Sequence, residues 1–237
     1  MPHGEEAHPA QGRRASDRGR YGRLSRERVL ATALEIVDRD GLSGLSMRKL
    51  GAELGVEAMA LYRYAAGKGA LLDGLVEAFY QELEDGLAGQ PQVADWRGEL
   101  QRIALATHGV ALRHPNMVPL LATRLLSTPL ARRPAAVLRG DERVLALLHG
   151  AGLGDRRTVE VHRAFTAWLL GYLLVELRAM DDAPGEPDPA FRLGLHRMPA
   201  QEFPRLRATA LSLDGRGGPE QLAAGLDALL GPADPRS

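Results

Sequence analysis

Apolar residues recur along most of the chain three and four positions apart, which places them on one face of an α-helix. Glycine and proline residues divide this pattern into segments. Ser25 and Ser46 belong to residue types that cap helices and stand before the first two segments. No sustained run alternates between apolar and polar residues, so the sequence predicts an all-α protein. Helices are expected over residues 25–40, 46–55, 57–64, 70–87, 95–113, 117–126, 135–151, 155–180, 200–213 and 219–230.

The order of these segments predicts two domains preceded by an arm. Three short helices and a long one precede a break at Gly89 to Pro91, so we expect a three-helix domain over residues 23–84 and a larger helical domain over residues 90–237. Residues 1–22 are rich in Gly, Pro, Arg and Ala without periodicity, which predicts a disordered basic arm. The arm either contacts DNA or is only a solvated terminus, and the sequence leaves both open.

Composition narrows the class of protein. The chain has 237 residues, of which 45% are hydrophobic and 25% charged, and a net charge of zero, as in ordinary globular proteins. The absence of cysteine excludes disulfides, thiolate metal sites and cysteine nucleophiles. The N-terminus lacks the apolar stretch of a signal peptide, and the most apolar segment, Phe165 to Val175, is too short to span a bilayer. We therefore expect a cytoplasmic protein that does not bind membranes.

The segment Met47 to Ala66 meets the requirements of a helix-turn-helix, in which two short helices pack at a steep angle. Gly51 is a small residue where the second helix would cross the first. Gly55, four positions later, suits a tight turn with a positive φ. Their shared core would be formed by Leu50, Leu54, Val56, Leu61 and Tyr64. The alternative is a purely structural three-helix bundle.

The outward face of the second helix would enter the major groove of DNA. Residues 58–60 are small or apolar and could touch thymine methyl groups, whereas Arg48 is the candidate for a guanine contact. Tyr62 and the two lysines, Lys49 and Lys68, are placed for phosphates. The predicted DNA-binding residues are Met47, Arg48, Lys49, Ala58, Met59, Ala60, Tyr62, Arg63, Tyr64 and Lys68.

Residues 24 to about 84 resemble the DNA-binding domain of the tetracycline-repressor (TetR) family. The resemblance rests on the run LSRERVLATALEIVDRDGLSGLSMRKLGAELGVEAMALYRYAAGKGALLDGL. The remainder resembles the tetracycline-repressor-like C-terminal domain more loosely, through LLHGAGLGDRRTVEVHRAFTAWLLGYLLVELRAM and QLAAGLDALLG. The resemblance implies a homodimeric repressor that binds double-stranded operator DNA and is released from it by a small-molecule effector. A ligand would bias helix 70–87 and so change the separation of the two recognition helices.

Two positions depart from the family pattern. Ala65 stands where the family usually has a bulky apolar residue. No histidine falls at the positions where tetracycline repressors hold a drug-bound magnesium ion, although Glu176 matches an acidic position of that motif. We therefore do not expect a magnesium–tetracycline ligand, a resident metal or another cofactor.

The family resemblance also implies a four-helix dimer interface built from helices 155–180 and 219–230. The apolar stripes assigned to it are Val161, Phe165, Trp168, Leu169, Tyr172 and Leu173, extended by His162 and Glu176, and Leu222, Leu226, Leu229 and Leu230. The alternative is that both stripes face the core of their own chain.

A ligand pocket is expected between helices 95–113, 117–126, 135–151 and 155–180. A mostly apolar pocket with a few polar groups is the usual form of such a site, so we expect a mostly apolar ligand. The candidate ligand-binding residues are His108, His114, Arg124, His162 and Glu176. For each of them the alternative is an ordinary solvated side chain.

Two other classes of protein are considered. Ser46 to Lys49 matches S-x-x-K without its partner motifs, and the glycine-rich run Gly150 to Gly154 has no preceding strand, so we do not expect an enzyme. The second class is a helical ligand-binding protein that does not bind DNA, which the apolar residues 58–60 would fit.

Overall fold

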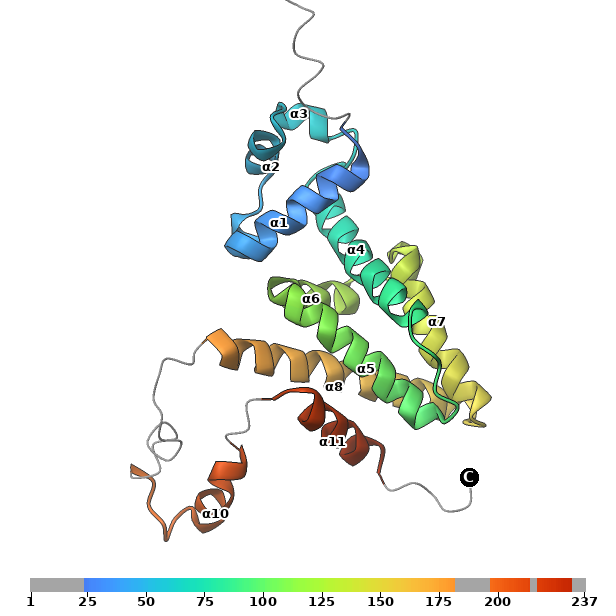
Figure 1. Cartoon of the computed structure of the whole chain (residues 1–237), viewed down its shortest axis with the longest axis vertical. Helices are drawn as coiled ribbons and strands as arrows, with labels where there is room; N and C mark the ends of the chain where they lie inside the picture. The colour runs from blue at the N-terminus through green and yellow to red at the C-terminus, as the bar shows by residue number, and fades with distance from the viewer. Residues whose placement is uncertain (1–23, 182–196, 214–216, 232–237) are drawn as a thin grey trace, which may run out of the picture.

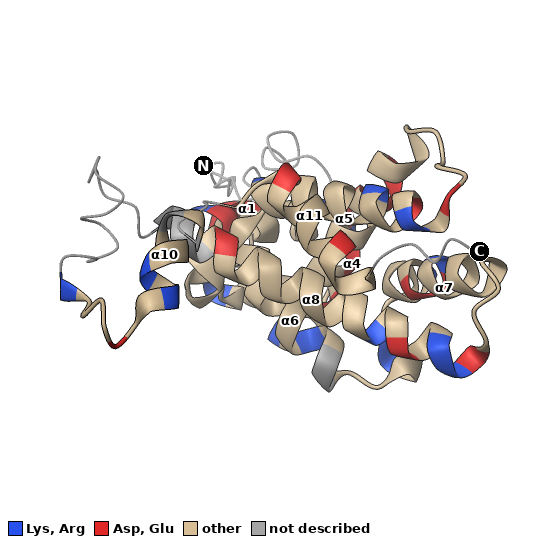
Figure 2. Cartoon of the chain, turned by 90° about the horizontal axis from the view of Figure 1, so that it is seen from below, with Lys and Arg blue, Asp and Glu red and all other residues tan. Residues whose placement is uncertain are grey.

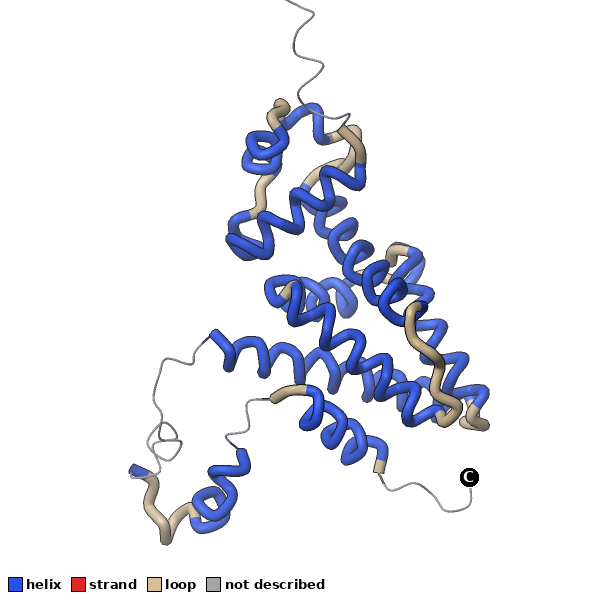
Figure 3. The backbone as a smooth tube through the Cα atoms, in the orientation of Figure 1, coloured by secondary structure: helices blue, strands red, loops and turns tan. Residues whose placement is uncertain are grey.

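The computed structural model describes residues 24–181, 197–213 and 217–231. Within these ranges the chain is helical and has no strand, which confirms the all-α prediction (Figure 3). The predicted arm, residues 1–22, lies outside the described residues. None of the helices in the described ranges is long and apolar enough to cross a membrane.

The first three helices form a small region at one end of the molecule (Figure 1). They are α1 (Arg26–Gly44), α2 (Met47–Leu54) and α3 (Ala58–Leu61). The predicted caps are present, because Ser25 accepts a hydrogen bond from the Arg28 amide and Ser46 accepts one from the Lys49 amide. Gly41 breaks the helical conformation with φ 71°, and the assigned helix continues past this kink to Gly44.

The small region has a closely packed apolar interior. Leu45, Leu50 and Leu61 are fully buried there, together with Ala33 and Val37 of α1. Helices α2 and α3, with 8 and 4 residues, are too short to be stable alone, so burial shared with α1 holds the region together.

A long helix, α4 (Lys68–Ala88), runs from the small region into a larger helical body (Figure 1). The body contains α5 (Trp96–Arg113), the 3₁₀ turn η1 (Pro115–Met117), α6 (Val118–Ser127), the 3₁₀ turn η2 (Leu130–Arg132), α7 (Ala135–Gly150), α8 (Asp155–Asp181) and α11 (Pro219–Leu230). Helix α10 (Pro204–Leu213) lies apart from it in Figure 1. These bounds differ by a few residues from the expected ones, and neither 3₁₀ turn was expected.

The recognition helix is shorter than the predicted range 57–64. Residues 62–64 form a turn after α3, although the Ala65 amide still donates to the Leu61 carbonyl at 3.0 Å. The Tyr64 hydroxyl donates to the Leu24 carbonyl at 2.9 Å, and Gly67 opens α4 with φ 136°. The chain therefore turns away into α4 where the periodic pattern alone would continue the helix.

Candidate DNA-binding and ligand-binding sites

The turn between α2 and α3 has the geometry that the sequence predicts for a helix-turn-helix. Gly55 adopts the left-handed conformation, with φ 68° and ψ 31°, and ends α2. A Cβ atom on Gly51 would lie 2.7 Å from the Val56 carbonyl oxygen and 3.2 Å from the Ala58 nitrogen. Because both neighbours are backbone atoms, only glycine lets α3 approach α2 this closely.

Helix α3 and the turn after it present an outward surface that the described residues do not cover. Met59 is 76% exposed and Tyr62 is 47% exposed, whereas Leu61 is fully buried. Arg48 at the start of α2 and Lys68 at the start of α4 are also exposed. The predicted base-contacting and phosphate-contacting side chains therefore share the solvent-facing side of the region, and their contacts with DNA stay a prediction.

Three predicted DNA-binding residues also make contacts within the chain. The Lys49 ammonium lies 2.8 Å from Asp40, and hydrogen bonds from Arg39 and Lys49 lower the pKa of that carboxyl. Tyr64 is half-buried, and its ring lies 5.7 Å from the Arg63 guanidinium carbon. A phosphate would have to compete with Asp40 for Lys49, whereas Arg48 and Lys68 have no such competitor among the described residues.

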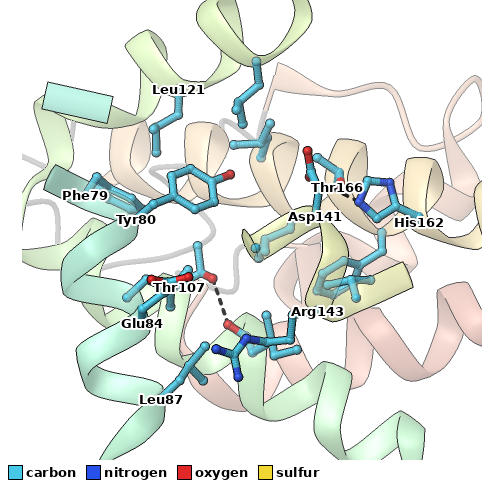
Figure 4. Close-up of a pocket in the computed structure, with 18 residues that line it drawn as sticks. Phe79, Tyr80, Glu84, Leu87, Thr107, Leu121, Asp141, Arg143, His162 and Thr166 are labelled. Carbon is cyan, nitrogen blue, oxygen red and sulfur yellow. Dashed lines mark hydrogen bonds and ion pairs between the residues drawn. The ribbon is translucent and has the colours of Figure 1, made fainter. Parts of the chain in front are cut away.

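The larger body contains a cavity of about 70 Å³ between α4, α5, α6, α7 and α8 (Figure 4). Its apolar walls include Phe79, Leu83, Ile103, Leu121 and Phe165. Its polar lining residues are Tyr80, Glu84, Thr107, Asp141, Arg143, His162 and Thr166. The sequence predicted four of the five helices, but it did not predict that α4 forms a wall.

Of the five predicted ligand-binding residues, only His162 lines this cavity, where its Nε2 atom lies 3.3 Å from Asp141. His108 is instead buried and pairs with Glu176, its Nε2 atom lying 2.9 Å from a carboxylate oxygen. Arg124 forms an ion pair with Asp73 of α4 at 3.1 Å. The structure therefore does not bring the five together into one site.

His114 lies where the small region meets the body. Its Nδ1 atom lies 2.8 Å from Asp38 of α1, and its Nε2 atom lies 3.0 Å from Glu82 of α4. Two residues further on, the Asn116 amide donates to the carbonyls of Val37 and Asp38. These contacts tie η1 to the second half of α1, so His114 connects the two regions and does not line the cavity.

The cavity residues that the sequence analysis missed are Tyr80, Glu84, Thr107, Asp141, Arg143 and Thr166. Burial and the Asp141 carboxylate raise the pKa of Tyr80, so its phenol keeps its proton. A polar side chain at a core-facing position of a helix, such as Thr107 four residues from both Ile103 and Ala111, is the sequence signal that could have identified some of them.

The apolar stripe assigned to the dimer interface faces the interior of the chain. Val161, Phe165, Leu169, Leu173 and Leu222 are buried without a second copy, so this prediction was wrong for them. Periodicity identifies the face that avoids water, and here α5, α6 and α7 pack on α8 while α11 packs on α5 and α8. The outer faces of α8 and α11 instead expose small or apolar residues: Ala164, Ala167, Gly171, Val175, Ala224, Ala228 and Leu229.

The elements described so far define a class of protein. A helix-turn-helix with an uncovered second helix, joined by one long helix to a helical body with an internal cavity, is the arrangement of a DNA-binding transcriptional regulator.

The chain belongs to the tetracycline-repressor family of bacterial regulatory proteins. Residues 29–75 match the family described as "Bacterial regulatory proteins, tetR family", and residues 88–231 match "Tetracyclin repressor-like, C-terminal domain". A Streptomyces coeruleorubidus relative, the HTH-type transcriptional repressor DrrR1, is 35% identical over 162 residues. That match covers 68% of this chain and 56% of the relative, less than two thirds of its length.

Solved structures agree with this assignment. A possible TetR family transcriptional regulator from Streptomyces coelicolor A3(2) is 29% identical and superposes with a TM-score of 0.71, covering 87% of this chain and 97% of that one. A single-residue variant of TetR from Acinetobacter baumannii AYE, solved in complex with minocycline, is 27% identical with a TM-score of 0.65 and covers 88% of this chain and 92% of that one.

Proposed function

We propose that the chain is a homodimeric repressor that binds operator DNA through α2 and α3 and leaves it when a small, mostly apolar molecule enters the cavity. One observation carries the DNA-binding part. Gly51 and Gly55 hold α3 against α2 while Met59 and Tyr62 stay uncovered, as an element that enters a major groove requires. DrrR1, a relative of this chain, is itself a transcriptional repressor.

The second copy would pack on the outer faces of α8 and α11. Residues 164–175 of α8 carry no charged side chain, and the charged residues of α11 are Glu220 and Asp227 (Figure 2). Small side chains such as Ala167 and Gly171 allow another helix to approach closely, and Val175, 71% exposed, supplies apolar area. A twofold dimer would present two recognition helices to a symmetric operator.

The coupling between cavity and DNA would run through α4. Phe79, Tyr80 and Leu83 of α4 line the cavity, and Gly74, nearer its start, packs against Leu30 of α1. The cavity of about 70 Å³ is far smaller than the roughly 300–1,000 Å³ of typical ligand sites. A ligand therefore enters only if the walls move apart, and a displaced α4 would carry α1 with it.

His114 and Asn116 form a second set of contacts between the body and the small region. They hold the end of α1 through Asp38 and the Val37 carbonyl, about two helical turns from where Leu30 contacts α4. Two attachments on α1 would make the small region follow the body as a rigid unit. The spacing of the two recognition helices then depends on the shape of the cavity.

A gel-shift experiment tests the DNA-binding part with DNA from upstream of the chain's own reading frame. The double variant Arg48→Ala/Lys68→Ala should lose the shift, while Arg157→Ala, an equally exposed arginine on α8, should keep it. Sedimentation should show that both variants remain dimers. Undiminished binding by the double variant would refute the assigned surface, and no shift by the parent chain would favour the alternative of a ligand-binding protein without DNA binding.

A further inference from the structure

Arg143 on α7 lines the cavity without a hydrogen-bond or ion-pair partner among the described residues. Its Nε atom is buried and has no hydrogen-bond partner. In the part of the chain that the structure describes, no ion pair to its guanidinium is formed either. In Figure 4 the side chain extends toward Leu87 and Thr107 of the cavity wall. An unsatisfied donor on a charged group costs free energy in the ligand-free protein, so it calls for an explanation.

The acidic side chains around the cavity are already engaged elsewhere. Glu84 pairs with Arg139 at 3.0 Å, and Asp141 pairs with Arg133 at 3.1 Å. Glu99, whose charge interacts with Arg143 over a longer range, is held by Arg102 at 2.6 Å. Each of these carboxylates therefore has a cation closer than Arg143, and the positive charge of Arg143 is left facing the cavity.

The rest of the lining determines what else a ligand must have. Aromatic and aliphatic side chains form most of the walls, so the body of the ligand must be apolar. The Tyr80 hydroxyl makes no hydrogen bond within the described residues and stays protonated, which makes it a second donor toward the cavity. Arg143 and Tyr80 thus both offer donors to the cavity, and both Glu84 and Asp141 are already paired with cations.

We propose that Arg143 is the group that recognises the effector, and that the effector is an apolar molecule carrying an anionic oxygen. This inference rests on the ligand-binding part of the proposed function and specifies the chemical class of its ligand. The Arg143 guanidinium would donate a charge-assisted hydrogen bond to the anionic oxygen of the ligand, because the described residues offer it no acceptor.

Two dyes with the same fused rings test this directly. Anilinonaphthalene sulfonate carries an anionic group, and phenylnaphthylamine is its uncharged counterpart. Fluorescence titration of the full chain should show tighter binding of the sulfonate. Arg143→Met should lower the affinity for the sulfonate by about 10- to 100-fold, since a hydrogen bond to a charged group is lost. The affinity for phenylnaphthylamine should change by less than about twofold.

Three further variants make the comparison specific. Arg143→Lys keeps the charge without the Nε–H donor and should retain part of the preference for the sulfonate. Arg157→Met removes an exposed arginine of α8 and should leave the affinity for both dyes unchanged. Thr166→Phe partly fills the cavity and should weaken both dyes, which assigns the binding to this site. The proposal would be overturned if Arg143→Met lost the same affinity for both dyes or lost affinity for neither. It would also be overturned if the parent chain bound no dye.

Thermal unfolding of the ligand-free protein separates recognition from a structural role. Arg143→Met removes an uncompensated, partly buried charge, so its Tm should equal or exceed that of the parent chain. A clear fall in Tm would show that Arg143 supports the fold, and would contradict the proposal. The gel shift without dye reports separately on the proposed function, because Arg143→Met should bind DNA as the parent chain does.

Discussion

The small three-helix region and the larger body differ in what fills their interiors. In the small region the buried side chains are apolar, and Gly51 leaves no room for a Cβ atom between the backbones of α2 and α3. The body buries Glu99, Arg102, His108 and Glu176, which satisfy one another in pairs. The small region is thus held together by apolar burial, whereas the body also buries paired polar side chains, none of which lines the cavity.

The largest effect is expected at the buried pair of Glu99 and Arg102. Two hydrogen bonds of 2.6 and 2.8 Å join these side chains, and Arg102 also donates to the Leu87 carbonyl at the end of α4. Glu99→Leu leaves the Arg102 charge buried alone and should lower the free energy of unfolding by about 3–5 kcal/mol. Urea unfolding at pH 7 measures this. The double variant Glu99→Leu/Arg102→Met should recover most of the loss, and a double variant as unstable as the single one would contradict this account.

The same pair predicts a pH dependence. Hydrogen bonds from Arg102 hold the pKa of Glu99 below its ordinary value of 4.5. A carboxyl with a lowered pKa stabilises the folded state fully above that ordinary value and ceases to do so as the pH falls through its folded pKa. The stability difference between the parent chain and Glu99→Leu should therefore be constant from pH 7 to about pH 5 and shrink in more acidic solution. A difference that grows below pH 4.5 would refute the assignment.

In the small region the most sensitive position should be Gly51. Gly51→Ala places a methyl group 2.7 Å from the Val56 carbonyl oxygen, which should cost about 1–3 kcal/mol and weaken DNA binding. Gly69→Ala is the matched control, because a Cβ there meets no atom within 4 Å. Circular dichroism should show that the body keeps its helices in both variants. Gly51→Ala with parental DNA affinity would mean that the α2–α3 contact is looser than described.

The junction between the regions should show a smaller effect. Asn116→Ala removes the amide that donates to the Val37 and Asp38 carbonyls, at an expected cost of about 1 kcal/mol. Hydrogen exchange should become faster in α1 and stay unchanged in α8, because only the attachment of the small region is weakened. Equal acceleration in both helices would show that Asn116 supports the body as a whole.

The smallest effect is expected for a single phosphate contact. Lys68→Ala should reduce the slope of log affinity for DNA against log salt concentration by about 0.9 for each lysine lost from the complex. Binding at several salt concentrations measures it, with Arg157→Ala as the control that leaves the slope unchanged. An unchanged slope in Lys68→Ala would remove this residue from the interface.

The difference between the regions also explains which of them could be predicted from sequence. A helix-turn-helix requires particular residue types at fixed short spacings, so Gly51, Gly55 and Leu61 identify it locally. The cavity is assembled from five helices far apart in the chain, and periodicity does not reveal which faces meet. His108, predicted as a ligand group, therefore proves to be paired with Glu176, and Arg143 went unnoticed.

The apolar stripe that was assigned to the dimer interface shows the same limit of sequence periodicity. Periodicity correctly identified Phe165 and Leu169 as side chains that avoid water, but it does not distinguish the chain's own core from a second copy. The exposed Ala167 and Gly171 carry almost no hydrophobic signal, although small residues are what close helix contact requires.

Selection of bound sequences from a random pool of duplex DNA tests the central claim, that two copies present α3 to one duplex. The account predicts an inverted repeat with half-sites about one helical turn or more apart, and no enrichment with the Arg48→Ala/Lys68→Ala variant. A single half-site without a repeat, or the same enrichment with that variant, would contradict it.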